Sequence, residues 1–528
     1  MIKYTDQNAI RNQIFKTPFE LGLDMENRWV IMSQIIPWDK MAVIYMNFMS
    51  SGLGRSTVDL RTIMGAMFIQ HTLNLTDRNT LEMISENIYM QYFVGLSSFQ
   101  TAPVFDHSLL SVFRQRLGEQ GAHQLNEILV SYAFENGQIK HRKSRSVSNK
   151  DDERDNNNEG TNKLTDDCKE EQSNVEVLEN RGTVKIDATV IPQNITYPTD
   201  TKLLNHSREI SESIIDALYE QSRELWDTKP RTYRREARNK WLDFSKSRKP
   251  KKKTISKQLK AQLGYLKRNL NHIDTMMHLI LKSNEQIILV ETLRKRMYVI
   301  SEIYRQQQEM YVDQRRSIAD RIVSVAQPWV RPIVRGKAGS PVEFGAKVNL
   351  SLTEKLVTVD YSSFDAFNEG TGLIDQLKSY KERFAYYPQY ALVDKIYLTR
   401  ANRKFMKTNG IKHTGNPLGR PKEIDRSKKA RMKKKNNERN HIEGKIGQGK
   451  QKFGWDNLRT KTVASSLCAI NLIALTMNML SLLKRSLSSK IEGIRALIAA
   501  LTKQVCINLS SELGYLFSKD NIGKSAII

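Results

Sequence analysis

The sequence predicts a mixed α+β protein in which many helical segments accompany a small number of strands. Apolar residues recur at helical spacing from about residue 21 to 133 and again over 201–335. By contrast, residues 183–191 (TVKIDATVI) alternate β-branched and other residues as a strand does. A second strand-like region at 342–361 is divided by a short turn, which predicts an antiparallel hairpin.

The net charge of the chain indicates the class of its binding partner. The 528 residues include 83 Lys and Arg against 57 Asp and Glu, a formal net charge of +26, which indicates a polyanionic partner. The three cysteines form no CxxC pair, so neither a disulfide framework nor a thiolate zinc site is expected. The first residues lack the apolar core of a secretory signal. These features favour a reducing, cytoplasmic setting.

Residues 1–138 are expected to form an all-helical domain that binds DNA or dimerises. Asp77 begins one helical segment, Gly95 ends a run of aromatic residues and Asp106 precedes the next helix. This arrangement is compatible with a helix-turn-helix motif. It fits equally well an ordinary helical bundle that packs against a second copy.

Residues 139–180 are charged, rich in Asn and nearly free of aromatics, which predicts a disordered linker. The helical region 201–335 contains a cationic stretch at 229–260, with fourteen Lys and Arg against two acids. Aromatic residues are interleaved with these cations, as in a nucleic-acid track, although a solvated helix face would look similar. The candidate DNA contacts in this stretch are Arg234, Arg235, Lys251 and Lys252.

The C-terminal part is expected to alternate strands and helices. Residues 373–384 predict a helix, 391–397 a short buried strand, and the following segment a helix that ends at Gly410. Residues 462–483 carry no charge and are long enough to cross a bilayer, but several Ser, Thr and Asn residues favour a buried helix of a soluble protein. The alternative is a membrane-associated protein anchored by this segment. Residues 486–528 predict a weakly helical tail.

Three carboxylates stand out because of where they occur. Asp187 interrupts the apolar strand 183–191, Asp394 lies near the end of the strand 391–397, and Glu443 is the carboxylate within a strongly basic segment at 439–454. Phosphodiester cleavage benefits from two divalent ions about 4 Å apart, and hard cations prefer carboxylate oxygens. If 439–450 is helical, Arg439, Glu443 and Lys450 share one face.

The residues alone leave other arrangements open. Three glycines in 444–449 each cost about 1 kcal/mol in a helix interior, so a basic glycine-rich loop is the plainer interpretation. Asp200, Asp360 and Asp365 also lie near predicted strand ends. Acids after strands are more often loop caps than metal ligands, and spacing does not choose among these positions.

These segments resemble the DDE transposases of bacterial insertion sequences, specifically insertion-sequence family five. The signature Tyr-x2-Arg-x3-Glu-x6-Lys of that family is matched by Arg439, Glu443 and Lys450, with Asn436 at the tyrosine position. KIDATVIPQNITYPTD at 185–200 is similar to the segment of the first aspartate, and VDKIYLTRANRKFMKTNGI at 393–411 to that of the second. A second departure is Lys395-Ile396 where many relatives have Arg-Gly.

The resemblance implies an RNase H-like catalytic core at 181–200 and 336–485, with a mixed five-stranded sheet, flanking helices and a helical insertion at 201–335 after the first strand. It implies that Asp187, Asp394 and Glu443 hold two Mg²⁺ ions, for which Mn²⁺ could substitute. Further phosphate contacts are expected from the basic residues around Glu443, which are Arg439, Lys445, Lys450 and Lys452.

The implied partners are double-stranded DNA, as terminal inverted repeats and as target, and at least one further copy of the chain when two ends are joined. The expected location is the cytoplasm, in association with the nucleoid. A relative that has lost activity but still occupies element ends is the alternative, since one signature position has changed.

Overall fold

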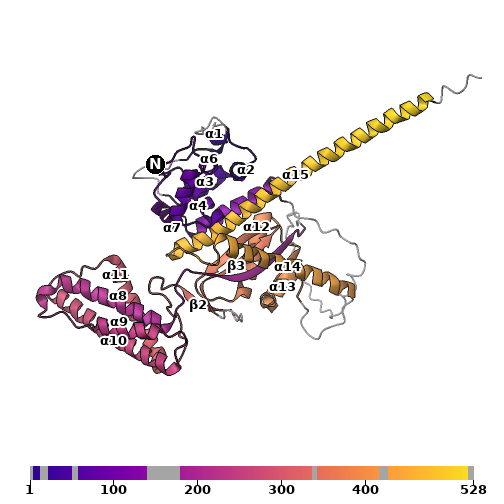
Figure 1. Cartoon of the computed structure of the whole chain (residues 1–528). Helices are drawn as coiled ribbons and strands as arrows, with labels where there is room; N and C mark the ends of the chain where they lie inside the picture. Colours follow the sequence, from indigo (N-terminus) through magenta and orange to yellow (C-terminus); the bar gives the residue numbers. More distant parts are fainter. Residues whose placement is uncertain are drawn as a thin grey trace, which may run out of the picture.

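A computed structural model of the chain describes residues 4–11, 22–49, 57–139, 179–335, 342–415 and 426–520. The linker predicted at 139–180 lies outside these residues except at its two ends, and so do residues 521–528 of the predicted tail. In the described part, helices surround a single curved sheet (Figure 1). The mixed α+β class predicted from the sequence is therefore confirmed.

Helices account for the N-terminal part. Side chains of Asn27, Asp59 and Thr76 accept backbone N–H groups at the starts of three of them. Asp77 begins a helix, as predicted, and Asp106 accepts the N–H of Ser108 at 2.8 Å where the last one starts. The helices are α1 (Gln7–Arg11), α2 (Arg28–Ile35), α3 (Trp38–Asn47), α4 (Leu60–Leu73), α5 (Asp77–Glu86), α6 (Ile88–Phe93) and α7 (Ser108–Glu135).

One mixed sheet lies at the centre of the molecule. Its strands are β1 (Thr183–Pro192), β2 (Arg331–Val334), β3 (Val342–Thr353), β4 (Leu356–Ser363), β5 (Tyr390–Leu392) and β6 (Lys412–His413). β3 is antiparallel to β1, β2 and β4, whereas β5 is parallel to both β1 and β6. β1 thus has partners on both sides. The hairpin predicted at 342–361 is confirmed as β3 and β4.

Two details of the sheet differ from the sequence prediction. The described sheet has six strands and not five, because the short strand β2 pairs with the beginning of β3. The strand predicted at 391–397 ends at Leu392, because Asp394 accepts the N–H of Lys395 and begins a 3₁₀ turn, η3 (Lys395–Tyr397). The helix α12 (Leu373–Phe384) has the predicted bounds, and α13 (Arg400–Thr408) follows η3.

A helical bundle is inserted between β1 and β2. It comprises α8 (Asp200–Gln221), a 3₁₀ turn η1 (Arg223–Leu225), α9 (Arg234–Ser245), α10 (Lys252–Lys282) and α11 (Glu291–Val312). Its apolar faces form a core of their own, with Leu204, Leu266 and Ile303 fully buried. Figure 1 shows the bundle as a separate lobe beside the sheet.

The two last helices cover the sheet. α14 (Arg426–Phe453) contacts β1 and β5, and α15 (Val463–Asp520) packs along α7, α4 and β4 before its end projects from the body (Figure 1). α15 is the described helix that is long and apolar enough to cross a membrane, over Val463–Gly493, but 83% of its most apolar window is buried within the protein. The prediction of a buried helix at 462–483 is therefore confirmed.

The N-terminal helices and the sheet share a single hydrophobic core. Leu125 of α7, Ile186 of β1 and Leu475 of α15 belong to the same cluster of fully buried side chains. At its centre the Asn478 carboxamide donates to Asn126 Oδ1 at 2.8 Å and accepts the N–H of Val357 at 2.8 Å. The N-terminal helices are therefore held firmly against the part of the chain that carries the three candidate acids.

Candidate active site

Asp187 is placed by the central strand. Its neighbours Ile186 and Ala188 are buried, and its own side chain is 20% exposed at one face of β1. The carboxylate accepts the N–H of Ala188 at 2.9 Å. Burial raises the pKa of Asp187, and the charges of Glu443 and Glu369 add to that increase, while Arg439 opposes it. Because burial disfavours the charged form of this carboxylate, a nearby cation would stabilise it.

Asp394 follows the neighbouring parallel strand. Lys185 of β1 is paired with Leu392 of β5, so Asp187 in β1 and Asp394 just after β5 each lie two residues beyond that pair. Neighbouring strands are about 4.8 Å apart, and side chains two residues apart in a strand point to the same face. Asp394 is exposed, and its Oδ1 accepts the N–H of Lys395 at 2.7 Å. The sheet therefore places the first two candidate acids on neighbouring segments beside the C-terminal end of β5.

Glu443 lies on α14 and comes close to Asp187 through Arg439. Arg439 and Glu443 are one helical turn apart, and Arg439 Nη2 donates to Glu443 Oε1 at 2.9 Å. The other terminal nitrogen, Nη1, lies 3.7 Å from Asp187 Oδ2. Arg439 thus lies between two carboxylates that are 256 positions apart in the chain, counted from 187 to 443.

The segment around Glu443 is a regular helix, so the glycine-rich loop considered from the sequence is wrong. Burial of Ile442 and Phe453 in the hydrophobic cluster formed with the sheet and α15 stabilises the helix by more than its glycines destabilise it. Gly449 is required by that packing, since a Cβ at this position would lie 2.1 Å from the Trp455 ring. Gly444 and Gly447 have open space where a Cβ would be.

A cavity of about 350 Å³ opens beside these residues. It is lined by Asp394 and Lys395 after β5, by Thr414 after β6, and by Asn436 and Arg439 of α14. Asn436, which takes the tyrosine position of the signature, therefore faces the same space as the second aspartate. Asp394 therefore faces the same cavity as Arg439, the residue that contacts Asp187 and Glu443.

The donor set suits a hard divalent cation by its chemistry, since three carboxylates come from β1, the end of β5 and α14. Within the described ranges, however, no group of three or more His, Cys, Asp or Glu side chains lies close enough to hold a metal ion. Arg439 supplies the positive charge between Asp187 and Glu443. The guanidinium thus neutralises the same oxygens that a divalent ion would need.

Sequence reasoning missed two residues of this site. Tyr397 of η3 is fully buried, and burial raises its pKa, with Glu369, Asp187 and Asp394 contributing further. Glu369 lies in the 3₁₀ turn η2 (Glu369–Gly372) and pairs with Lys347 at 2.9 Å. Neither residue has a periodic signal, because both belong to short turns whose place is set by the sheet.

The competing acids have structural partners. Asp360 is enclosed, where it accepts from Ser351 Oγ at 2.5 Å and Gln376 Nε2 at 2.6 Å, and burial raises its pKa. Asp200 begins α8 and pairs with Arg321 at 2.5 Å. Asp365 is exposed, 3.8 Å from Arg331. These contacts explain the three acids as parts of the fold.

The predicted phosphate contacts near Glu443 lie on more than one face of α14. Lys445 is partly buried, donates to Ser481 Oγ at 2.8 Å, and has its pKa lowered to about 8 by burial. Lys445 and Lys452 line an open groove of about 1290 Å³ between α14 and α15. Lys450 is partly exposed. The groove is a cationic surface next to the carboxylates.

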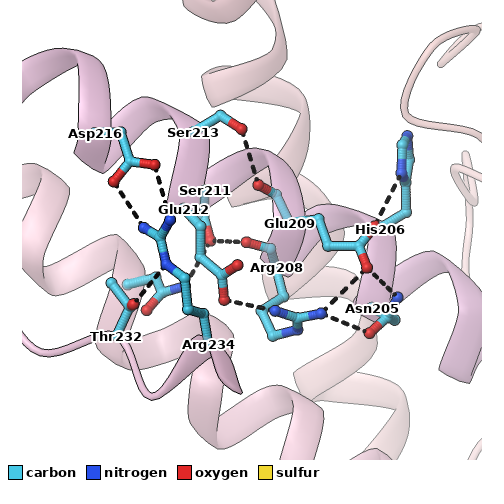
Figure 2. Close-up of polar contacts among 11 residues, drawn as sticks. Asn205, His206, Arg208, Glu209, Ser211, Glu212, Ser213, Asp216, Thr232 and Arg234 are labelled. Atoms are coloured by element: carbon cyan, nitrogen blue, oxygen red, sulfur yellow. Dashed lines mark hydrogen bonds and ion pairs between the residues drawn. The ribbon is translucent and has the colours of Figure 1, made fainter. Parts of the chain in front are cut away.

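The predicted contacts in the insertion differ in their surroundings. Arg235, Lys251 and Lys252 are exposed. Arg234 instead forms a two-pronged ion pair with Asp216 of α8, at 2.9 and 2.7 Å (Figure 2). That pair fastens α9 to α8, so the guanidinium of Arg234 is engaged within the bundle. Figure 2 also shows the buried Arg208, which donates to Glu212 at 2.5 Å.

Two segments of the chain match known protein families. Residues 19–116 match the family model described as Transposase domain (DUF772), and residues 391–480 match Transposase DDE domain. Each of these is a transposase domain. The two transposase matches support a DDE transposase of an insertion element, which acts on DNA and uses divalent metal in general. Asp394 and Glu443 lie inside the DDE match, whereas Asp187 lies outside both.

One curated protein is similar over part of the chain. It is described as an uncharacterized protein, ORF8 in the nfe locus, from Rhizobium meliloti, and is 24% identical over 193 residues, which is 37% of this chain and 75% of that protein. No solved structure matches the chain significantly. The transposase matches therefore carry the functional argument.

Proposed function

We propose that the protein is a DNA transposase of the insertion-sequence family five type, which binds the terminal inverted repeats of its element, cuts there and joins the element to target DNA. The observation that carries the proposal is the convergence of Asp187 and Glu443 on Arg439, with Asp394 two residues beyond the end of the adjacent parallel strand β5. Two of these acids lie in the segment that matches a transposase DDE domain.

The core that presents the acids is assigned to the RNase H-like class. Support comes from the mixed sheet, with β3 antiparallel and β5 parallel to the central strand, and from the helices that cover it. The helical bundle follows the first strand, where the resemblance places an insertion.

Asp187, Asp394 and Glu443 would hold two Mg²⁺ ions, or Mn²⁺ in their place, which when bound supply Lewis acidity for hydrolysis and strand transfer. Hydrolysis forms a bond from a water oxygen to phosphorus and breaks the bond to the 3′ oxygen, which leaves a 3′ hydroxyl at the element end. That hydroxyl then attacks a phosphodiester of the target, so that a bond from its oxygen to phosphorus forms, the bond from phosphorus to the target's 3′ oxygen breaks, and the target strand is left with a free 3′ hydroxyl. Asp187 contributes a carboxylate whose burial favours binding of a cation.

Basic side chains would hold the DNA strand beside these acids. Arg439 can exchange its carboxylate partners for phosphate oxygens, to which its planar fork is suited. Lys445, Lys450 and Lys452 would contact neighbouring phosphates. Joining two element ends requires at least a dimer on DNA, and we place the protein in the cytoplasm with the nucleoid.

Replacing Glu443 by Gln tests the proposal, because the amide keeps the shape of the side chain and removes its charge. The purified variant and the parent protein are incubated with Mg²⁺ and duplexes that carry the DNA flanking the coding sequence, and nicks are mapped. Cleavage should fall by at least about 100-fold, since a ligand of the proposed metal site is lost. Duplex binding should persist.

The matched control is Glu438→Gln on the same helix, whose carboxylate pairs with Lys435 at 3.0 Å. Cleavage by this variant should stay close to that of the parent. Equal cleavage by parent and Glu443→Gln proteins would contradict the assignment. Duplex binding without any cleavage by the parent would favour an inactive relative that occupies element ends.

A further inference from the structure

A second cavity, of about 500 Å³, lies away from the three acids. One wall is formed by the turn between α4 and α5 and by the start of α7, and the other by the connector between α14 and α15. The first wall belongs to the segment that matches one transposase domain and the second to the segment that matches the other. A ligand in this cavity would touch both.

The charge of the lining is positive. Arg78 comes from the first wall, and Arg459 and Lys461 come from the second, all with exposed side chains. Asp77 is the one acid in the lining, and Arg114 Nη2 neutralises it at 2.6 Å. Among the described residues, Arg78, Arg459 and Lys461 form no ion pair within 4.0 Å. The cavity is therefore suited to an anion.

Two further features lie at the wall of the same cavity. α5 begins at Asp77 after the cap Thr76, so the positive end of its helix dipole lies at the cavity wall. Independently, His71 lines the cavity with a side chain that is nine-tenths buried, and its Nε2 has no hydrogen-bond partner in the described part of the chain. A buried nitrogen without a partner is costly, and an anion oxygen would satisfy it.

The two walls are held in contact. Gly454 has φ +88°, a conformation that favours glycine, and a Cβ at this position would lie 2.8 Å from Asn74 Oδ1, so the two walls approach closely here. Arg459 Nη1 donates to the backbone oxygen of Asn74 at 3.4 Å. Gly454 directly follows α14, the helix that carries Glu443. The cavity is thus joined to the candidate active site by one helix.

We propose that this cavity binds a backbone phosphate of the DNA substrate and so ties the N-terminal helices and the catalytic core to the same duplex. The inference rests on the proposed function for the identity of the ligand. Arg78, Arg459 and Lys461 contact phosphate oxygens, and the contact is independent of base sequence. A free phosphate or nucleotide shares this chemistry, and the experiment separates these sources.

The test compares full-length proteins in duplex binding, measured by fluorescence anisotropy in EDTA over a series of salt concentrations. The probe is a labelled 30-base-pair duplex of the flanking DNA. The double variant Arg459→Gln/Lys461→Gln should bind about tenfold more weakly, and its plot of log affinity against log salt should be shallower by about 2, because two phosphate contacts are lost. Thermal unfolding confirms that the variant is folded.

Two controls separate a local site from general charge. Lys282→Gln/Arg294→Gln removes two exposed cations from the helical insertion and should leave affinity within about twofold of the parent. Asn457→Trp fills the cavity without altering charge and should weaken binding, since Asn457 is exposed in its lining. Equal losses for the two double variants, or unchanged binding by both cavity variants, would overturn the proposal.

A third arm uses inorganic phosphate. If phosphate raises the unfolding temperature of the parent but not of Arg459→Gln/Lys461→Gln, while both bind duplex equally, the cavity serves a small anion and the proposal fails. Because binding is read without divalent metal, these outcomes are independent of the cleavage test with Glu443→Gln.

Discussion

At the scale of single residues, the carboxamide of Asn478 joins three segments that are distant in the chain. It contacts Asn126 of α7 and both backbone groups of Val357 in β4 from its place in α15. All of these groups are buried. In such a site each polar atom left without a partner carries the cost of its lost hydration.

Asn478→Ala is expected to destabilise the protein by about 3 kcal/mol, because it removes the acceptor of the Val357 N–H and the donor to Asn126 Oδ1. The change is measured as a lowered midpoint of thermal or urea unfolding. Ser488→Ala, at an exposed position of the same helix, is the control and should change the midpoint little. Equal midpoints for the two variants would contradict this role of Asn478.

His71 gives a pH dependence at the same scale. Burial lowers its pKa to about 3, and the Arg114 guanidinium acts in the same direction while Asp77 opposes it. The folded state therefore keeps His71 neutral at pH values where the unfolded chain, with a pKa near 6.5, takes up a proton. Protonation favours unfolding, so stability is lost as the pH falls from about 6.5 towards 3.

Relative to His71→Gln, the parent should therefore lose at most about 1.4 kcal/mol of stability per pH unit in this window. Urea unfolding of both proteins at pH 7.5, 6 and 5 measures the difference. Parallel pH profiles of the two proteins would show that His71 is not the titrating group. Above pH 7 the difference between them should stay constant.

At the scale of elements, α14 carries Arg439 and Glu443 of the candidate site. Its glycines differ in how closely other side chains pack against them. Gly449 lies against the Trp455 ring, whereas Gly447 faces open space in the groove beside α15. A methyl group added at the first position must displace a packed ring, but at the second it only restricts the unfolded chain and favours the helix.

Gly449→Ala is expected to lower stability by about 1–3 kcal/mol through overpacking, while Gly447→Ala should raise it by up to about 1 kcal/mol. Unfolding midpoints of both variants measure the contrast on one helix with one chemical change. A loss of stability in Gly447→Ala as large as in Gly449→Ala would mean that helix backbone freedom, and not the contact with Trp455, requires glycine here.

The elements show which parts of the fold can be predicted from sequence. The strand at 183–191, the hairpin at 342–361 and the helix at 373–384 follow from local patterns of side chains, and the structure contains them at nearly the predicted bounds. β2 has only four residues, which is too short for a local pattern to predict, and it forms a strand because it pairs with β3. The helix at α14 depends on burial of Ile442, which the local sequence does not reveal.

The same reasoning applies to the candidate site. Asp187 and Glu443 stand out by their contexts in a strand and a basic segment, but the resemblance to DDE transposases was needed to choose them, and the structure has both carboxylates close to Arg439. Glu369 and Tyr397 escaped notice because η2 and η3 carry no periodic pattern. The engagement of Arg234 with Asp216 was equally hidden, since that contact joins two helices of the bundle.

At the scale of the whole molecule, positive charge is spread over the insertion, the groove beside α14 and the second cavity. A net charge of +26 predicts strong and salt-dependent attraction to DNA. The cations of the insertion are of two kinds, since Lys251 and Lys252 are exposed near the start of α10, whereas Lys246 and Lys295 are paired with Asp243 and Glu291 at 3.0 and 2.7 Å.

Lys251→Gln/Lys252→Gln should therefore make the salt dependence of duplex affinity shallower by about 1–2, because up to two phosphate contacts disappear. Lys246→Gln/Lys295→Gln removes as much charge from paired positions and should have a smaller effect. Binding titrations at 50–300 mM salt compare the two. A shallower slope in the second variant only would place the DNA track elsewhere on the bundle.

The central position of β1 has a consequence for how the protein is made. Both of its sheet neighbours, β3 and β5, are encoded more than a hundred codons downstream, beyond the whole helical bundle. A nascent chain that has left the ribosome as far as β1 has two unsatisfied strand edges and must wait for synthesis to proceed before they can be closed. Products of premature termination before α14 lack Glu443 altogether, so under the proposed function they are expected to be unable to cleave DNA.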